Sequence, residues 1–166
     1  MGERPDDCSY ERGATKKMDK VGFDCTSYVF PQDITDEEFQ KEFDKINNDD
    51  NIDGILLLRP LPKHINEKAI EERINPVKDL DGISPVNLAK VYAGDVNGFA
   101  PCTAEAVIEM LDYAGIDLTG KRVTVVGRSL VIGKPVAMML MKKNATVTVC
   151  HTKTKDMAGT CRNAEV

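Results

Sequence analysis

Residues 123–135 read VTVVGRSLVIGKP, an aliphatic run that meets one glycine and then a second glycine followed by lysine and proline. This order predicts a strand over Arg122–Val126, a tight turn at Gly127 and a helix over Ile132–Lys143. A second aliphatic strand is predicted over Ala145–Cys150. In such a unit the N–H groups of the helix start can face a phosphate, so the stretch suits a dinucleotide-binding fold.

The spacing of the two glycines does not by itself identify a ligand. Gly127 and Gly133 are separated by five residues, so the pattern departs from the G-x-G-x-x-G of many dinucleotide sites. A strand–helix–strand turn with two conformational glycines and no nucleotide is the alternative interpretation.

The end of the second predicted strand bears on the choice of cofactor. Residues 150–155 read CHTKTK, without a carboxylate, and Arg128 and Ser129 lie in the glycine turn. NAD sites often place an acidic side chain at this point for the ribose hydroxyls. Several donors without an acid suit a 2′-phosphate, so these residues favour NADP over NAD. Solvated surface residues at a strand end are the alternative, for His151 in particular.

Outward from this unit, strand and helix patterns alternate, which predicts an α/β fold with parallel sheets. The stretch from Asn75 to Pro101 is rich in glycine and proline and is predicted to be loop. We place a domain boundary near Gly98, which gives residues 1–98 and 99–166. The other predicted elements are helices over Asp7–Val21, from Thr35 through Ile46, over Asn66–Ile74 and over Thr103–Tyr113, and strands over Phe23–Phe30 and Gly54–Leu58.

Composition excludes several classes of partner. The net charge of −5 argues against a nucleic acid or an anionic membrane as the main partner. The longest uncharged apolar run, Gly54–Leu58, is far shorter than the roughly 20 residues that span a bilayer. The five cysteines are odd in number and form no C-x-x-C pair, which favours reduced thiols in the cytoplasm.

Four motifs occur in a fixed order along the chain. They are DGILLLRPLPKHI at 53–65, KDLDG at 78–82, GFAPCT at 98–103 and GRSLVIGKP at 127–135. Together they resemble the methylenetetrahydrofolate dehydrogenase/methenyltetrahydrofolate cyclohydrolase (FolD-type) family, from about Gly2 to Val166. Each motif alone is weakly specific, whereas the ordered set is highly specific.

The resemblance implies an architecture and a reaction. A partial N-terminal α/β catalytic domain is followed by a partial Rossmann-type dinucleotide-binding domain, and the folate lies in a cleft between them. The family implies a homodimer, NADP as cofactor, tetrahydrofolate as substrate and no metal. It implies oxidation of 5,10-methylene- to 5,10-methenyl-tetrahydrofolate and then hydrolysis to the 10-formyl compound, with the protein mainly orienting the reacting rings.

The resemblance also assigns site residues, unevenly. The family pairs a tyrosine, here Tyr10, with a lysine four residues later, where this chain has Ala14. A family glutamine is replaced by Leu58. The residues matched at the substrate site are Asp81, Pro101, Cys102 and Thr103, and those matched at the cofactor site are Gly127, Arg128, Ser129, Gly133, His151 and Thr152.

The two replacements raise a hypothesis about the second reaction. Neither alanine nor leucine can move a proton, so we expect a dehydrogenase with weak or absent cyclohydrolase activity. Lys17, one turn beyond Ala14 on the helix face that carries Tyr10, is a competing candidate for the missing group. An inactive folate- or nucleotide-binding fragment is the alternative function, and a shikimate-type dehydrogenase is disfavoured by the Pro-Leu-Pro and Pro-Cys-Thr segments.

Length sets a further expectation. A dinucleotide domain has two strand–helix–strand halves, and only one such unit, Arg122–Cys150, is visible. The sequence therefore looks like the middle of a longer chain. The family resemblance implies that it lacks a first strand of the catalytic domain and the later strands of the Rossmann domain. Exposed strand edges would then cause poor solubility or assembly with a partner.

Overall fold

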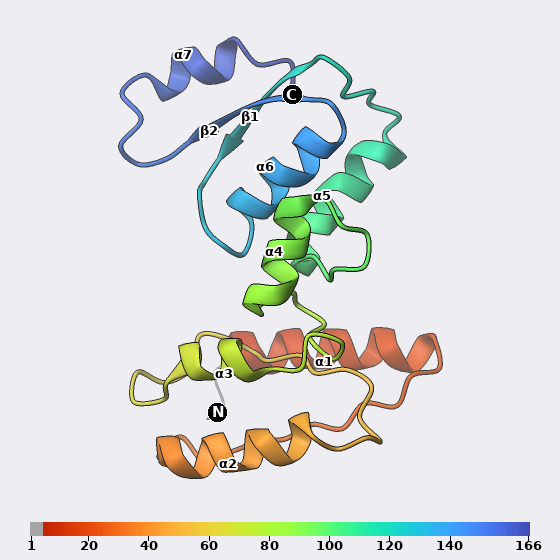
Figure 1. Ribbon diagram of the computed structural model, residues 1–166, viewed down its shortest axis with the longest axis vertical. Coiled ribbons are helices and arrows are strands. Elements are labelled where there is room, and N and C mark those ends of the chain that lie inside the picture. The colour runs from red at the N-terminus through yellow and green to blue at the C-terminus, as the bar shows by residue number, and fades with distance from the viewer. Residues whose placement is uncertain (1–4) are drawn as a thin grey trace. The chain divides into compact units, whose positions relative to one another are not determined.

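The computed structural model describes residues 5–166, which form two compact units. The first unit holds the described residues up to Asp50 together with Leu57–Ile70, and the second holds Asn51–Leu56 and Glu71–Val166. Helices alternate with two parallel strands in the second unit, so the chain is α/β as predicted (Figure 1). Within residues 5–166, no helix is both long and apolar enough to cross a membrane.

The first unit is built on two helices, α1 (Pro5–Lys20) and α2 (Asp36–Asn47) (Figure 1). Phe39 and Phe43 lie one turn apart on α2 and are both 3% exposed, so they anchor this helix in its core. The ring of Phe30 packs edge-on against Phe39 with centroids 5.3 Å apart. The predicted helices Asp7–Val21 and Thr35–Ile46 are therefore confirmed to within a few residues.

A capping box precedes α2. The Thr35 hydroxyl accepts a hydrogen bond from the Glu38 N–H at 3.2 Å, and the Glu38 carboxylate accepts one from the Thr35 N–H at 3.2 Å. The Thr35 hydroxyl also donates to that carboxylate at 2.8 Å. These bonds hold the pKa of the Glu38 carboxyl below its usual value.

Thr35→Ala is expected to lower the free energy of unfolding by about 1 kcal/mol, because the first turn of α2 loses its cap. The lowered pKa of Glu38 means that its part of this stability is present at neutral pH and is lost as the pH falls through that pKa. Urea unfolding of both proteins at pH 7 and at pH 3 measures this, and the difference between them should shrink in acid. A difference that grows in acid would contradict the assignment.

The predicted strand over Phe23–Phe30 is wrong. Residues 23–30 run without helix or strand structure, and no described residue pairs with them in a ladder. Phe23 and Val29 are 66% and 68% exposed. A strand needs a hydrogen-bonded neighbour, so β-forming composition without one leaves only irregular chain. The strand predicted over Gly54–Leu58 is likewise reduced to one parallel bridge, between Ile55 and Asp79.

The segment from Asn75 to Pro101 is more ordered than its composition predicts. It contains α4 (Pro85–Ala93), whose start is capped by the Ser84 hydroxyl and whose end is Gly94 in the left-handed region at φ 71°. Proline at the first position of a helix and glycine after its last are helix signals rather than loop signals. Within this stretch, which is predicted to be rich in loop, these nine residues are therefore helical. The predicted helix Asn66–Ile74 is present as α3 (Glu67–Arg73).

The second unit contains the strand–turn–helix–strand unit expected from residues 122–150. Strands β1 (Arg122–Val126) and β2 (Thr146–Cys150) are parallel, with Val123 opposite Val147. Helix α6 (Gly133–Lys142) packs against both strands, and α5 (Cys102–Tyr113) and α4 pack against α6. A short helix, α7 (Met157–Arg162), follows β2. The core between these elements is aliphatic and consists of Ala104, Ile108, Leu118, Val123, Val136 and Leu140.

The last residue of the chain lies on the other side of β1. The Val166 N–H donates to the Arg122 carbonyl at 3.4 Å, and the Val166 carbonyl accepts from the Thr124 N–H at 3.0 Å. This is the hydrogen-bond pattern of a parallel ladder, so β1 has backbone neighbours on both sides. Strand β1 therefore pairs with β2 on one side and hydrogen-bonds to Val166 on the other.

Candidate functional site

The turn after β1 is built around two glycines that approach each other closely. Gly127 has a φ of 141°, and its N–H donates to the Cys150 carbonyl at 2.8 Å. A Cβ placed on Gly133 would lie 2.2 Å from the Gly127 carbonyl oxygen and 2.7 Å from the Arg128 nitrogen. Both neighbours are backbone atoms that cannot rotate away, so only glycine fits at position 133. The pair predicted from the sequence is thus a tight turn that holds the start of α6 beside the end of β1.

Ser129 forms three hydrogen bonds within this turn. Its hydroxyl oxygen accepts hydrogen bonds from the N–H groups of Ile132 at 3.0 Å and Gly133 at 3.4 Å, and its carbonyl accepts one from Lys134 at 3.0 Å. Ser129 therefore orders the first turn of α6. The neighbouring Arg128 side chain is exposed to solvent.

The end of β2 lies beside the same turn, because the hydrogen bond from Gly127 reaches Cys150. The His151 N–H donates to the Thr154 hydroxyl at 2.9 Å, and the His151 Nδ1 accepts from the Lys153 N–H at 3.1 Å. This arrangement places the proton of a neutral imidazole on Nε2. Thr152 is exposed. The structure thus brings the six predicted cofactor residues to the carboxyl edge of one parallel sheet.

These residues fit an NAD(P) cofactor. The glycine turn lets backbone approach closely, α6 begins at that turn, and residues 127–129 and 151–155 carry cationic and hydroxyl side chains and no acid. A pyrophosphate needs the first two features, and a 2′-phosphate is compatible with the third.

A second group of predicted residues lies together elsewhere in this unit. The Cys102 N–H donates to the Asp81 carboxylate at 3.4 Å, and the Cys102 thiol donates to the Leu80 carbonyl at 3.2 Å. Pro101 is fully buried, whereas Cys102 and Thr103 at the start of α5 are exposed. The Asp81 turn and the Pro101–Thr103 segment therefore form one local cluster.

The electrostatics of this cluster argue against Cys102 as a nucleophile. Partial burial of the thiol, and then the negative charge of Asp81, raise the pKa of the Cys102 thiol, and Glu105 adds to the effect. A thiol with a raised pKa holds less thiolate at neutral pH and reacts more slowly. Cys102 is thus a backbone and thiol donor to its neighbours.

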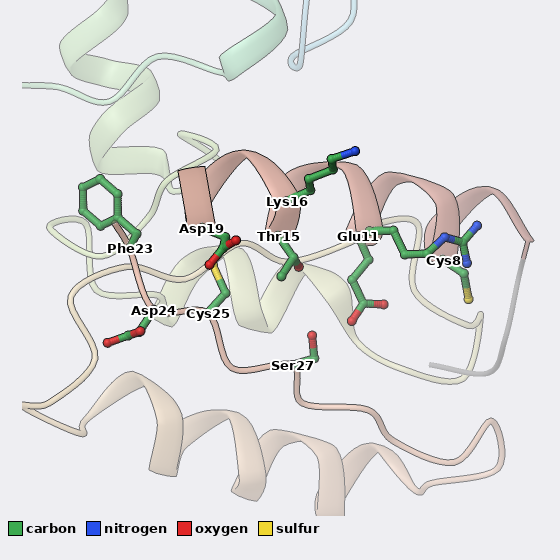
Figure 2. A pocket seen from close by; sticks show the side chains of 10 residues that line it. Cys8, Glu11, Thr15, Lys16, Asp19, Phe23, Asp24, Cys25 and Ser27 are labelled. Atoms are coloured by element: carbon green, nitrogen blue, oxygen red, sulfur yellow. The ribbon is translucent and has the colours of Figure 1, made fainter. Parts of the chain in front are cut away.

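The residues predicted in the first unit lie on α1. Tyr10 is 56% exposed, Ala14 is half-buried and Lys17 is exposed. A pocket beside α1 is lined by other residues of this helix and by the segment 23–27 (Figure 2). Glu11, Thr15 and Asp19 point toward that segment, whereas Lys16 projects away from it (Figure 2). Neither Tyr10 nor Lys17 lines this pocket. Leu58, at the position of the family glutamine, is half-buried in the same unit.

Sequence patterns missed one buried polar group in the second unit. Asp79 and Asn87 are 0% exposed and Ser84 is 2% exposed. Asp79 stands in the KDLDG motif, and Ser84 followed by Pro85 is a helix-start signal, so the pattern of a cap was available in the sequence. Their burial depends on the tertiary fold and was not predictable from spacing.

Comparison with known proteins finds two family models along the chain. Residues 1–81 match the family model of the tetrahydrofolate dehydrogenase/cyclohydrolase catalytic domain, and residues 101–166 match its NAD(P)-binding domain. The bifunctional protein FolD of Clostridioides difficile is 49% identical over all 166 residues, which cover 58% of that relative. FolD of Clostridium kluyveri is 46% identical over the same residues.

Solved structures agree with these relatives. The bifunctional FolD of Campylobacter jejuni matches with a TM-score of 0.95 at 37% identity, over 99% of this chain and 58% of that one. The Trypanosoma brucei enzyme, solved with NADP cofactor and inhibitor, matches with a TM-score of 0.92 at 36% identity, over 99% of this chain and 56% of that one. The chain thus spans somewhat more than half the length of its relatives. Its motifs, its glycine turn and both domain matches show that it belongs to the tetrahydrofolate dehydrogenase/cyclohydrolase family of enzymes.

Proposed function

We propose that this chain carries out NADP-dependent oxidation of 5,10-methylenetetrahydrofolate to 5,10-methenyltetrahydrofolate. The observation that carries the proposal is the turn at Gly127 and Gly133 beside the strand end at His151, which has the geometry and the cationic character for NADP. The Trypanosoma brucei relative solved with NADP supports this choice. NADP, when bound, supplies the hydride acceptor, and the protein supplies position.

The roles that we propose for the residues come from the family resemblance, and their positions in the structure support them. The cofactor would be held by the turn residues Gly127, Arg128, Ser129 and Gly133 and by His151 and Thr152 at the strand end. The carboxylate of Asp81 would accept hydrogen bonds from the pterin, and Pro101, Cys102 and Thr103 would line the folate and nicotinamide beside it. Hydride transfer needs positioning rather than a general base, so this set is sufficient for the dehydrogenase step.

The second family reaction is proposed to be weak or absent. Hydrolysis of the methenyl compound needs a group that handles protons, and Ala14 and Leu58 stand where the family has lysine and glutamine. Tyr10 lies on the same face of α1 as Ala14, and in this proposal it still contacts the folate. Lys17 is the candidate that could substitute for the missing lysine.

The test is a direct assay of the purified chain with methylenetetrahydrofolate and NADP, following the absorbance of the methenyl product. We expect turnover that depends on both substrates and is lost in Asp81→Asn. The absence of product at high protein concentration would overturn the proposal. NADP binding without turnover would then favour the alternative of a nucleotide-binding fragment.

We further propose that the two functional parts divide near Gly98, that the chain pairs as a homodimer through its NADP-binding part, and that it works in the cytoplasm. The first family model ends at residue 81 and the second begins at residue 101, which supports the division.

The proposed dimer contact involves α6 and β2. Met141 on α6 is 52% exposed and Val149 on β2 is 39% exposed, which supports an apolar contact between the NADP-binding parts of two chains. Light scattering should give twice the chain mass of 18.3 kDa. A monomer would contradict the dimer.

A further inference from the structure

A carboxylate is buried in the second unit with no exposure to water. Asp79 is 0% exposed, and its two oxygens accept three hydrogen bonds. Oδ1 accepts from the Ile83 N–H at 3.0 Å, and Oδ2 accepts from the Ser84 N–H at 2.8 Å and from the Asn87 side-chain amide at 2.9 Å. Removing a carboxylate from water costs free energy, so the burial of Asp79 within this hydrogen-bond network needs a structural or functional explanation.

Asn87 extends this network to a second segment of chain. Its amide nitrogen also donates to the Pro76 carbonyl at 2.9 Å, and its side-chain oxygen accepts from the Phe99 N–H at 3.2 Å. Asn87 is itself fully buried on α4. One side chain therefore ties the loop that begins at Pro76, the carboxylate of Asp79 and the segment that begins at Phe99.

The two tied segments are those that carry the substrate-site cluster. Asp81 follows Asp79 by two residues, and Cys102 follows Phe99 by three. Gly82, directly after Asp81, has a φ of 59°, and a Cβ on it would lie 2.4 Å from the carbonyl oxygen of Phe99 in the second segment. The backbone of the Asp81–Gly82 turn thus rests directly on the second segment, and the Cys102 N–H meets the Asp81 carboxylate at 3.4 Å.

We propose that Asp79 and Asn87 are positioning residues, a buried clamp that fixes the Asp81 carboxylate against the Pro101–Thr103 segment. Neither residue needs to touch substrate for this. Asp79 fixes the backbone that follows Asp81 through two N–H groups, and Asn87 fixes the opposite segment through Phe99. Side chains held in this way have their orientation set before a ligand arrives. The importance of the clamp for catalysis rests on the proposed dehydrogenase function, whereas its geometry does not.

Cys102 reports on the clamp without folate or NADP. Partial burial raises the pKa of the Cys102 thiol most, and the charges of Asp81 and then of Glu105 raise it further. In Asp81→Asn the thiolate fraction should rise, so iodoacetamide should alkylate Cys102 about threefold faster at pH 8. If Asp79 positions Asp81, the same substitution should have little effect in an Asp79→Asn background.

The experiment is therefore a double-mutant cycle on the intact chain, with Cys102 and Cys150 alkylation rates read by peptide mass spectrometry. Cys150 is 1% exposed and serves as the internal sensor of unfolding, since it should stay unmodified in every folded variant. Asp156→Asn is the matched control, because Asp156 is an exposed carboxylate that caps α7, accepting from the Gly159 N–H at 2.8 Å. This control should leave the rate at Cys102 unchanged.

The outcomes separate clearly. Loss of the Asp81 effect in Asp79→Asn, with Cys150 protected, supports the clamp. An equal effect of Asp81→Asn in both backgrounds overturns it. If Cys150 becomes reactive in Asp79→Asn, that variant is replaced by Asn87→Ala. This variant keeps both backbone bonds to Asp79 and removes the links from Asn87 to Pro76, to Phe99 and to the Asp79 carboxylate. If the chain shows this coupling between Asp79 and Asp81 but no dehydrogenase activity, the clamp is supported and only the proposed function is contradicted.

Discussion

Replacing Ala14 with lysine should give this chain a measurable hydrolysis of 5,10-methenyltetrahydrofolate. Ala14 lies one helical turn after Tyr10 on α1, so a lysine there shares its face. Positioned proton transfer contributes about 10²-fold or more to such reactions, and alanine contributes none. We therefore expect Ala14→Lys to raise the hydrolysis rate by about 10²-fold while hydride transfer changes little. The decay of methenyl absorbance without NADP measures the first rate.

Gly13→Lys is the matched control for this gain. It adds the same charge to α1 one residue earlier, where a Cβ would meet no atom within 4 Å, so the helix should accept it. The neighbouring position points about 100° away around the helix, and hydrolysis should not rise. An unchanged rate in Ala14→Lys, or an equal gain in both variants, would contradict the assignment of position 14.

Lys17→Ala tests the competing candidate for the same role. If Lys17 already handles the proton, the unsubstituted chain should hydrolyse the methenyl compound, and Lys17→Ala should abolish that activity. If position 14 is the site, Lys17→Ala should change nothing. Leu58→Gln added to Ala14→Lys should increase hydrolysis further, because an amide can hydrogen-bond the new lysine or the substrate where leucine cannot.

The part of the fold that local sequence predicts well is the unit from Arg122 to Cys150. Its two strands are short, continuous aliphatic runs, and they pair with each other across a helix that local pattern also predicts. Everything needed to define this unit lies within 29 residues. The turn at Gly127 was predicted for the same reason, since the glycines that permit it are adjacent to the elements it joins.

The errors occur where a residue depends on distant partners. Phe23–Phe30 has strand composition, but no described residue forms a ladder with it, and composition alone does not make a strand. Conversely, the glycines and prolines of Asn75–Pro101 were interpreted as loop, although Pro85 begins and Gly94 ends a helix. In both segments the residue types were identified correctly, and their meaning was decided by what lies around them.

The site divides in the same way. Residue identity pointed to Asp81, Cys102 and the glycine turn, and the structure brings Asp81 to Cys102 and Gly127 to Cys150. The buried network of Asp79 and Asn87 was not predicted, because Phe99 and Pro76 meet Asn87 only through the tertiary fold. Spacing identifies residues that face a ligand more readily than the buried residues that hold them.

Gly133→Ala should abolish tight NADP binding while the chain remains folded. The added Cβ would lie 2.2 Å from the Gly127 oxygen and 2.7 Å from the Arg128 nitrogen, so the turn must widen. Widening moves the start of α6 away from the end of β1 and separates the backbone from the phosphates that it should bind. We expect the Kd for NADP to rise about tenfold or more, which is a loss of about 1.4 kcal/mol or more in binding free energy.

Gly13→Ala provides the control for this prediction, because it makes the same substitution inside α1 with open space around the new Cβ. It should leave NADP binding unchanged and stabilise the chain by up to about 1 kcal/mol, since alanine is the better helix former. Isothermal titration calorimetry with NADP and circular dichroism on both variants distinguish lost binding from lost folding. Unchanged NADP affinity in a folded Gly133→Ala would show that the closeness of Gly133 to Gly127 serves the packing of α6 alone, and the cofactor would then have to bind elsewhere.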